Sequence, residues 1–162
     1  MAAGLGVNMC ADLWSFALST YARPGVEAAC LRLQEQGADV CLLLCGAWLE
    51  QRGVARLPER VVALQQLARP WRMDVVEPLR KIRRRWRVMA QQDVQLAALR
   101  EQLKAMELQA ERTLLTRLEA LAQTWPINEV NGQYEWLEGL TSETVDLDHD
   151  ALQQLRVVIT RT

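Results

Sequence analysis

Apolar residues recur along the first part of the chain at the three- and four-residue spacing of amphipathic helices. The pattern predicts a helix over residues 12–21, with Asp12 as its N-cap. A second helix is predicted between Pro24, which suits a first helical turn, and Gly37, which suits a helix end. Asp39 is expected to cap a third helix that is apolar nearly all round, and such a helix belongs at the centre of a bundle.

The middle of the chain predicts two further helices. One begins at Pro58 and is expected to end at the pair Arg69-Pro70. Asp74 and Glu77 stand three residues apart, as in a capping box, and predict the start of the next helix. Its apolar stripe, which is expected to face the core, consists of Val75, Leu79, Ile82, Trp86 and Met89.

From Leu79 to Trp125 the chain contains no Gly or Pro, so the local preference is for helix throughout. The apolar stripe is interrupted between Gln91 and Asp93, which predicts a turn or kink there. Beyond this point the apolar spacing is close to 3.6 residues, which favours a long helix packed on a globular bundle over a left-handed coiled coil. A homodimer built on this long helix is left open.

The sequence changes character after Trp125-Pro126. Asn131-Gly132 lies between short alternating runs and favours a small β-hairpin, with Ile127, Tyr134 and Trp136 on one face. Asp148 is expected to cap a last helix. The expected fold is therefore all-α: a compact bundle of five or six helices with one long C-terminal helix over residues 1–124, followed by an acidic segment, 125–162, that is docked or partly disordered.

Charge is distributed unevenly although the net charge is only −1. The stretch 69–91 is strongly basic, whereas 118–155 contains acidic residues and no Lys or Arg. The basic helix carries the candidate binding residues, which are Arg80, Lys81, Arg83, Arg84, Arg85 and Arg87. Helical spacing predicts that Arg80, Arg83, Arg84 and Arg87 spread over the outward side, opposite Ile82 and Trp86. Lys81 and Arg85 are expected at the margins of this side.

Three hypotheses of function are considered, and the first two rest on these charges. The leading one is a non-enzymatic adaptor or regulatory protein that presents the basic helix to an acidic protein or ribonucleoprotein partner. The second is direct, largely sequence-independent RNA or DNA binding through the same helix. The third is a small-molecule-binding bundle with a pocket among Trp14, Tyr21 and Trp48. Against the first two stands the alternative that the acidic segment folds back on the basic helix and neutralises it.

The sequence argues against several chemistries. Cys41 and Cys45 share a helical face, but with one histidine and no CxxC spacing they are interpreted as buried thiols, and no metal or other cofactor is expected. No nucleophile motif or phosphate-binding loop is present, so an enzyme is not expected. Glu107 and Glu111 are interpreted as surface partners of Lys104 and Arg112.

The remaining expectations concern tryptophans and location. Most of the six tryptophans are expected in the core, whereas Trp71 and Trp136 are expected beside loops, where an exposed indole could anchor a partner. The longest apolar run, residues 40–49, is about half of a bilayer span, so no membrane span is expected. The absence of a secretory signal pattern before the cysteines favours a reducing cytoplasm.

Three motifs resemble those of a known family. They are Leu13-Trp14-Ser15-Phe16-Ala17-Leu18 with Tyr21, then Pro24-Gly25-Val26-Glu27-Ala28-Ala29-Cys30-Leu31, then Val75-Val76-Glu77-Pro78-Leu79-Arg80. In this pattern, LWxFxLxxY … PGVxxACL … VVxPLR, the chain resembles a family of small bacterial cytoplasmic proteins of unknown function, over roughly the first 125 residues. The resemblance implies an intracellular, bacterial, helical protein and brings no activity, ligand or catalytic residue with it.

Overall fold

The structure is a computed structural model of the 162-residue chain, and it describes residues 12–129, 132, 135–142 and 147–160. These residues are helical or loop, and none of them forms a strand. The expected all-α class is confirmed. The predicted hairpin includes Asn131 and Tyr134, which lie outside the described residues. On either side of them, Ile127 is exposed in a loop and Trp136 begins a helix.

The compact part of the molecule is built around one buried helix. α2 (Leu13–Tyr21) and α3 (Val26–Glu35) precede α4 (Val40–Gln51), in which every residue from 42 to 49 is buried. The predicted caps are present. Asp12 accepts a hydrogen bond from the Ser15 amide at 2.7 Å, and Asp39 accepts one from the Leu42 amide at 3.2 Å. The prediction of a central third helix is therefore confirmed.

The two helices predicted in the middle of the chain form one continuous helix. α5 (Pro58–Trp71) passes through Pro70 into a π-helical turn, η1 (Arg72–Val76), and then into α6 (Glu77–Met89). In η1 the Glu77 amide bonds to the carbonyl of Arg72, five residues back. The predicted break at Arg69-Pro70 and the predicted new start at Asp74 are both wrong, because the wider π turn between the prolines lets the helix continue along α7.

The π turn also changes which side chains of α6 face inward. In α5 the buried face passes through Leu64 and Ala68. A regular helix would carry this face on to Ile82, as the apolar stripe predicts. The extra residue of the π turn moves the buried face of the helix one position along the chain. As a result, Val76 and Arg80 are buried and Ile82 is exposed. The predicted inward stripe is therefore wrong for part of its length.

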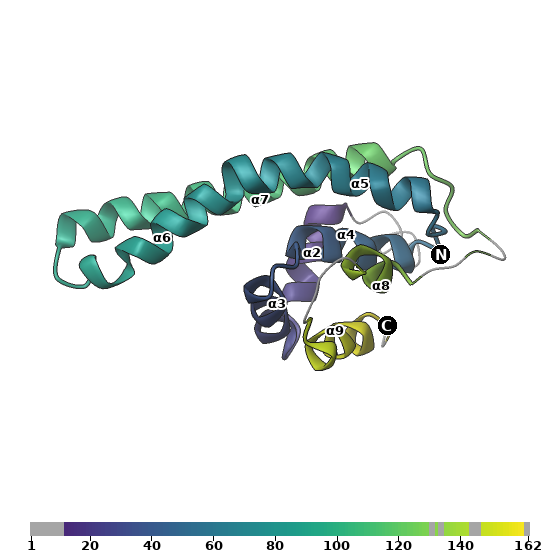
Figure 1. Cartoon of the computed structure of the whole chain (residues 1–162), viewed down its shortest axis with the longest axis horizontal. Helices are drawn as coiled ribbons and strands as arrows, with labels where there is room; N and C mark the ends of the chain where they lie inside the picture. The colour runs from purple at the N-terminus through teal and green to yellow at the C-terminus, as the bar shows by residue number, and fades with distance from the viewer. Residues whose placement is uncertain (1–11, 130–131, 133–134, 143–146, 161–162) are drawn as a thin grey trace, which may run out of the picture.

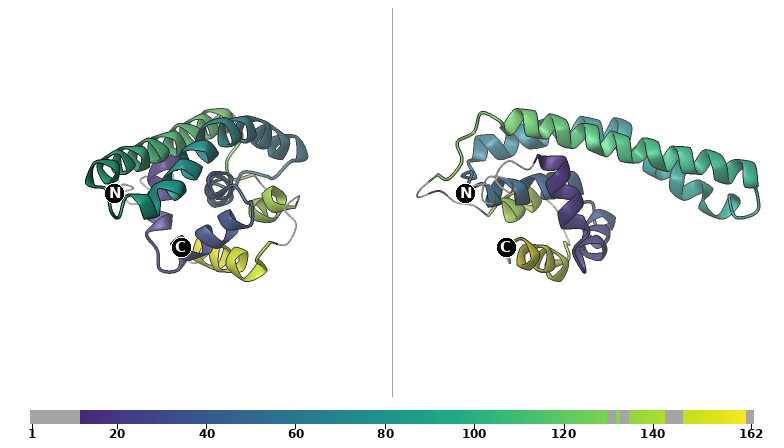
Figure 2. Two further views of the ribbon diagram at one scale, coloured as in Figure 1. Left: turned by 60° about the vertical axis from the view of Figure 1, so that its left-hand side comes forward. Right: turned by 180° about the vertical axis from the view of Figure 1, so that it is seen from behind.

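The predicted turn between two long helices is confirmed. α6 ends at Met89, and Asp93 caps α7 (Val94–Ala122) by accepting a hydrogen bond from the Leu96 amide at 3.0 Å. α6 and the first part of α7 lie side by side and project from the compact part of the molecule (Figures 1 and 2). We call residues 77–109 the arm. None of these residues, all of which the structure describes, belongs to the hydrophobic core.

The described residues of the acidic segment pack on the bundle. α8 (Trp136–Thr141) lies on α4, and α9 (His149–Thr160) lies on α3, away from the arm (Figure 1). Asp148 caps α9 as predicted, by accepting a hydrogen bond from the Ala151 amide at 3.1 Å. The described residues of the segment thus cover α3 and α4 rather than the basic helix.

Of the two tryptophans expected beside loops, Trp136 is the first residue of α8, as expected, whereas Trp71 lies within the continuous helix of α5 and η1. Trp136 is fully buried at the start of α8, where its indole N–H donates to the Val54 carbonyl at 2.8 Å and its ring stacks on Trp125. Trp71 is half-buried, and its indole N–H donates to the Ala110 carbonyl at 2.9 Å. Neither therefore offers a free aromatic anchor, because both indoles are engaged within the fold. Among the described residues, no helix combines the length and apolar composition required to cross a membrane.

Candidate functional site

The six basic residues of α6 divide into two groups. Arg80 is only 6% exposed and Arg83 is half-buried, and both side chains turn toward α7. The expectation that these two arginines point outward is therefore wrong, because the π turn brings their positions onto the inward face. The remaining four residues are exposed, as predicted: Lys81, Arg84, Arg85 and Arg87.

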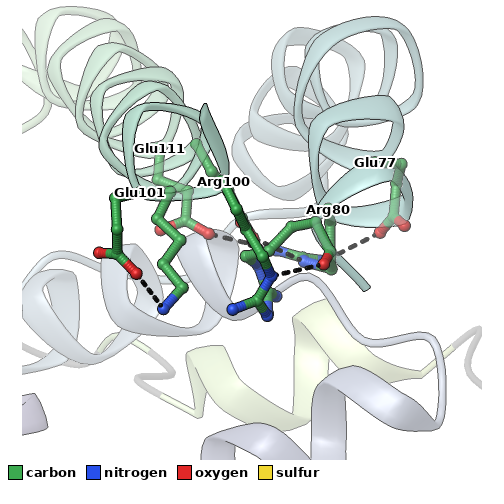
Figure 3. A network of polar contacts seen from close by, with 8 residues as sticks. Glu77, Arg80, Arg100, Glu101 and Glu111 are labelled. Carbon is green, nitrogen blue, oxygen red and sulfur yellow. Dashed lines mark hydrogen bonds and ion pairs between the residues drawn. The ribbon is translucent and has the colours of Figure 1, made fainter. Parts of the chain in front are cut away.

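Arg80 is surrounded by carboxylates from its own helix and from α7. Its Nη1 lies 3.0 Å from Glu77 Oε1, its Nη2 lies 3.2 Å from Glu111 Oε1, and its Nε lies 3.4 Å from Glu107 Oε1. Figure 3 shows Glu77 and Glu111 on either side of the guanidinium. With its oxygen turned toward Arg80, the amide of Gln34 on α3 accepts a further bond from Nη1 at 2.8 Å. Arg80 thereby links α6 to both α7 and the bundle.

The second arginine extends this network. Arg83 donates through Nε and Nη2 to the two carboxylate oxygens of Glu107. Its carbonyl accepts a hydrogen bond from Arg100 Nε at 3.0 Å. Glu107 is buried, so its charge is compensated by arginines rather than by water. The network holds α6 and α7 together along the arm.

Glu107 and Glu111 are therefore not surface partners of Lys104 and Arg112, and that prediction is wrong. Lys104 instead pairs with Glu101 at 3.0 Å, and the Arg112 guanidinium lies over the ring of Trp14. Sequence reasoning missed the network because it paired Glu107 and Glu111 only with basic residues of their own helix. The signal was present in two acids four apart on one helix and two arginines three apart on the preceding, antiparallel helix.

The outer face and tip of the arm carry charge next to apolar side chains. No ion pair among the described residues involves the four exposed basic residues of α6. At the tip, Val88 is 71% exposed and Val94 is 88% exposed, and Met89 between them is also exposed. This combination of exposed cations and exposed apolar side chains is a candidate contact surface.

A cleft of about 540 Å³ lies where the arm joins the bundle. Its walls come from α2, α3 and the start of α4 on one side and from η1, α6 and α7 on the other. Trp14 and Tyr21 line it, as the hypothesis of a pocket predicts, but Trp48 does not. Trp48 is buried in the core, and the Arg52 guanidinium lies over its ring. The prediction is right for two of the three aromatic residues.

Several ionisable groups in the cleft have a raised pKa, and two buried polar atoms there have no hydrogen-bond partner. Burial raises the pKa of Asp39, although the Leu42 amide and Arg72 oppose the shift. Asp39 Oδ2 and Arg72 Nε are buried without a hydrogen-bond partner. Burial likewise raises the pKa of Glu111. The negative charge of Glu107 raises this pKa further, and the positive charge of Arg80 lowers it. Burial also raises the pKa of Tyr21 to about 12, so at neutral pH its hydroxyl keeps its proton and can donate.

The described cysteines are free thiols. Cys30, Cys41 and Cys45 form no disulfide, and burial raises the pKa of each thiol above its usual value. A thiol kept in its protonated form is a weak nucleophile and a weak metal ligand. Among the described residues, no group of three or more His, Cys, Asp or Glu side chains is arranged to hold a metal ion.

The comparison with protein families identifies the chain by its sequence. A family model described as a protein of unknown function (DUF2390) matches residues 12–118. The chain belongs to this family. The DUF2390 match runs from α2 into α7, so it includes the whole arm and every residue that lines the cleft. No curated protein and no solved structure matches the chain. The resemblance to an uncharacterised family is confirmed, and the DUF2390 description assigns no activity.

Proposed function

We propose that this DUF2390 protein is a non-enzymatic interaction protein whose arm binds an acidic surface on a partner protein, free or within a ribonucleoprotein. The observation that carries the proposal is the arm itself. It projects from the bundle, contributes no residue to the core, and carries exposed cations beside exposed apolar side chains. A surface that the fold does not need and that costs electrostatic self-repulsion is best explained by an outside partner.

Charge alone would suit nucleic acid as well as protein, and the apolar tip favours protein. Binding to phosphates is dominated by Lys and Arg and gains little from valine or methionine side chains. Protein interfaces, in contrast, bury an apolar centre inside a polar rim. Val88 and Val94 would provide that centre, and Arg84, Arg85 and Arg87 would provide the basic rim.

The proposal separates contact residues from structural ones. Lys81, with the three exposed arginines, is assigned to the partner contact. Arg80 and Arg83 are assigned to the arm's own stability, because their guanidinium groups are engaged by carboxylates. A charge reversal at the first group should leave the fold intact, whereas one at the second should not.

Affinity purification of the tagged full-length protein from its native host, with and without nuclease, tests the proposal. We expect a partner that survives nuclease and is lost from the variant Arg84→Glu, Arg85→Glu, Arg87→Glu. The variant Arg32→Glu, which reverses an exposed charge on α3, should retain it. With the purified partner, the triple variant should weaken binding at least about tenfold, and added salt should weaken the wild type in the same direction.

Two results would count against this function. A partner retained equally by the triple variant would show that the basic face is not the contact. Retention that depends on nucleic acid, and that disappears at moderate salt with a steep log–log dependence, would favour the alternative of direct RNA or DNA binding. The double substitution Val88→Ser and Val94→Ser separates the two cases, because it should weaken binding to a protein partner but not binding to nucleic acid.

A further inference from the structure

The cleft between the bundle and the arm has apolar walls that remain open to solvent. Leu18, Leu31 and Leu108 line it from three different helices, and all three side chains are exposed. Single exposed leucines are ordinary on protein surfaces, but convergence of three on one cavity is typical of a ligand site. The volume of about 540 Å³ also lies within the range for small-molecule sites. The walls therefore suit a molecule with a substantial apolar part.

The cleft contains four donor groups that still have an N–H or O–H to offer. Arg72 Nε has no acceptor. Arg83 uses Nε and Nη2 for Glu107, and no partner of its Nη1 is found among the described residues. Within the described part of the chain, Lys104 bonds only to the exposed Glu101, a pair that solvent screens strongly. The Tyr21 hydroxyl adds a fourth donor that makes no hydrogen bond within the described residues.

Several acceptors of the cleft are occupied. Both carboxylate oxygens of Glu107 bind arginines, and Glu111 Oε1 binds Arg80. Asp39 Oδ1 caps α4. The cleft acceptors without a partner among the described residues are Asp39 Oδ2, the second oxygen of Glu111 and the carboxylate of the exposed Glu27. The start of α4 lines the same cleft through Val40 and adds the positive end of a helix dipole. An incoming acceptor would therefore meet four donor groups in the cleft, with Glu27 as the exposed acid near Tyr21.

We propose that this cleft is a binding site for an amphipathic carboxylate, a molecule with an apolar body and one carboxylate head. The body packs on the three exposed leucines and on Trp14. The head accepts hydrogen bonds from Lys104, Arg83 and the Tyr21 hydroxyl. A single negative charge suits the site better than a phosphate dianion, because Glu27, Glu107 and Glu111 stand nearby and would repel a second charge. A cationic head would face Arg72, Arg83 and Lys104, which repel it.

Three probes that share one apolar chain distinguish the head groups. Dodecanoate, dodecanol and dodecylammonium are titrated into the full-length protein below their micellar concentrations, with binding followed by calorimetry and by tryptophan fluorescence. We expect saturable binding of one dodecanoate per chain. Dodecanol should bind about tenfold more weakly, since it lacks the charge-assisted hydrogen bonds, and dodecylammonium should bind more weakly still.

A matched pair of lysine variants tests the head of the site. Lys104→Gln should weaken dodecanoate binding about tenfold and leave dodecanol binding unchanged, because it removes only the charged donor. Lys81→Gln removes an exposed lysine of α6 that does not line the cleft, and this variant should bind dodecanoate like the wild type. Neither lysine belongs to the buried network, so both variants are expected to fold normally.

A matched pair of leucine variants tests the apolar wall. Leu108 lines the cleft and is 52% exposed, whereas Leu99 is 53% exposed on the same helix and does not line it. Leu108→Glu should abolish dodecanoate binding, and Leu99→Glu should not change it. Equal affinity for all three probes, equal binding by the two leucine variants, or no dodecanoate binding at millimolar concentration would each overturn the proposal. Because the probes are titrated into the purified protein with no partner present, the outcome is independent of partner binding.

Discussion

The buried Glu107 shows how strongly one residue depends on its neighbours. A carboxylate removed from water loses a large solvation energy, which Arg80 and Arg83 restore by direct hydrogen bonds. Removal of one member of such a network is costly because the others remain buried without a partner. Exposed pairs in the same helix carry no such penalty.

We therefore expect Glu107→Gln to destabilise the protein by about 3 kcal/mol in urea unfolding followed by circular dichroism. Glu101→Gln, which breaks the exposed pair with Lys104, should change the free energy of unfolding by less than about 0.5 kcal/mol. Equal effects of the two substitutions would show that the Glu107 network does not stabilise the fold.

Asp39 gives a pH-dependent prediction. Its pKa is raised by burial in the folded state, so the folded protein holds this proton more tightly than the unfolded chain. The contribution of Asp39 to stability must then fall as pH rises from about 4, the ordinary value, up to the raised pKa. Asn keeps an oxygen that can cap α4 and does not titrate.

The variant Asp39→Asn should accordingly gain stability relative to the wild type as the pH rises through this interval. The measurement is the difference between the unfolding free energies of the two proteins from pH 4 to pH 8. A difference that is constant with pH, or that falls as pH rises, would contradict the raised pKa.

Residues that act locally were predictable from the sequence, and residues that act across helices were not. Asp12, Asp39 and Asp148 cap helices because a short acceptor reaches amides two or three residues ahead, and sequence alone shows that geometry. The inward position of Arg80 depends on Glu107 and on the backbone of η1. Neither influence appears in the apolar periodicity of α6.

At the scale of elements, the packing of α8 on α4 depends on a close approach at Gly46. A Cβ atom added there would lie 2.7 Å from Leu140 Cδ1 and 3.2 Å from Trp136 Cβ. The absence of a side chain at this position therefore lets the two helices come together. The sequence suggested only that this helix was central, since the partner helix lies some ninety residues away along the chain.

Gly46→Leu should destabilise the protein by about 1–3 kcal/mol, because the added side chain must displace α8 although leucine favours helix. The control Ala105→Leu places the same side chain on an exposed position of α7 and should be close to neutral. The two variants are compared by urea unfolding. Near-neutral behaviour of Gly46→Leu would contradict a close α4–α8 contact.

Helix boundaries were predicted where a cap or a break in the apolar pattern set them, and mispredicted where proline was given priority. Pro70 was expected to end α5, as its missing N–H and its ring usually require. Contacts of α5, η1 and α6 with α7 stabilise the continuous helix instead. Such contacts join residues far apart in the sequence, so no local pattern reveals them.

At the scale of the whole molecule, the hydrophobic core and the proposed partner contact lie in different parts of the chain. The hydrophobic core draws on α2, α3, α4, α5, the second half of α7, α8 and α9. The arm lies outside it and is held by its own ion pairs. The composition suggested a bundle with a long helix, but only the three-dimensional arrangement shows that much of that helix extends beyond the core.

We expect the arm to be removable in part without loss of the fold. Replacement of residues 84–99 by a four-residue loop containing Asn-Gly keeps Arg83 beside Arg100, whose Nε bonds to the Arg83 carbonyl. The shortened protein should show a helical circular dichroism spectrum and a cooperative unfolding transition within about 2 kcal/mol of the wild type. It should also lose the partner of the arm and retain dodecanoate binding. Loss of cooperative unfolding would show that the arm is part of the folding unit.

The π turn has a consequence for comparisons among relatives. The π turn occupies one residue more than a regular helical turn. A homologue that lacks one residue here and has no proline at position 78 can therefore form a regular helix with the same inward face. Alignment columns in η1 would then need a single gap for the arginines of the two chains to coincide. Deletion of the exposed Met73 together with Pro78→Ala mimics that homologue. In α7 there is no π turn that could absorb a deletion. Removal of the exposed Gln109 would therefore rotate Glu107 away from Glu111 by about 100°.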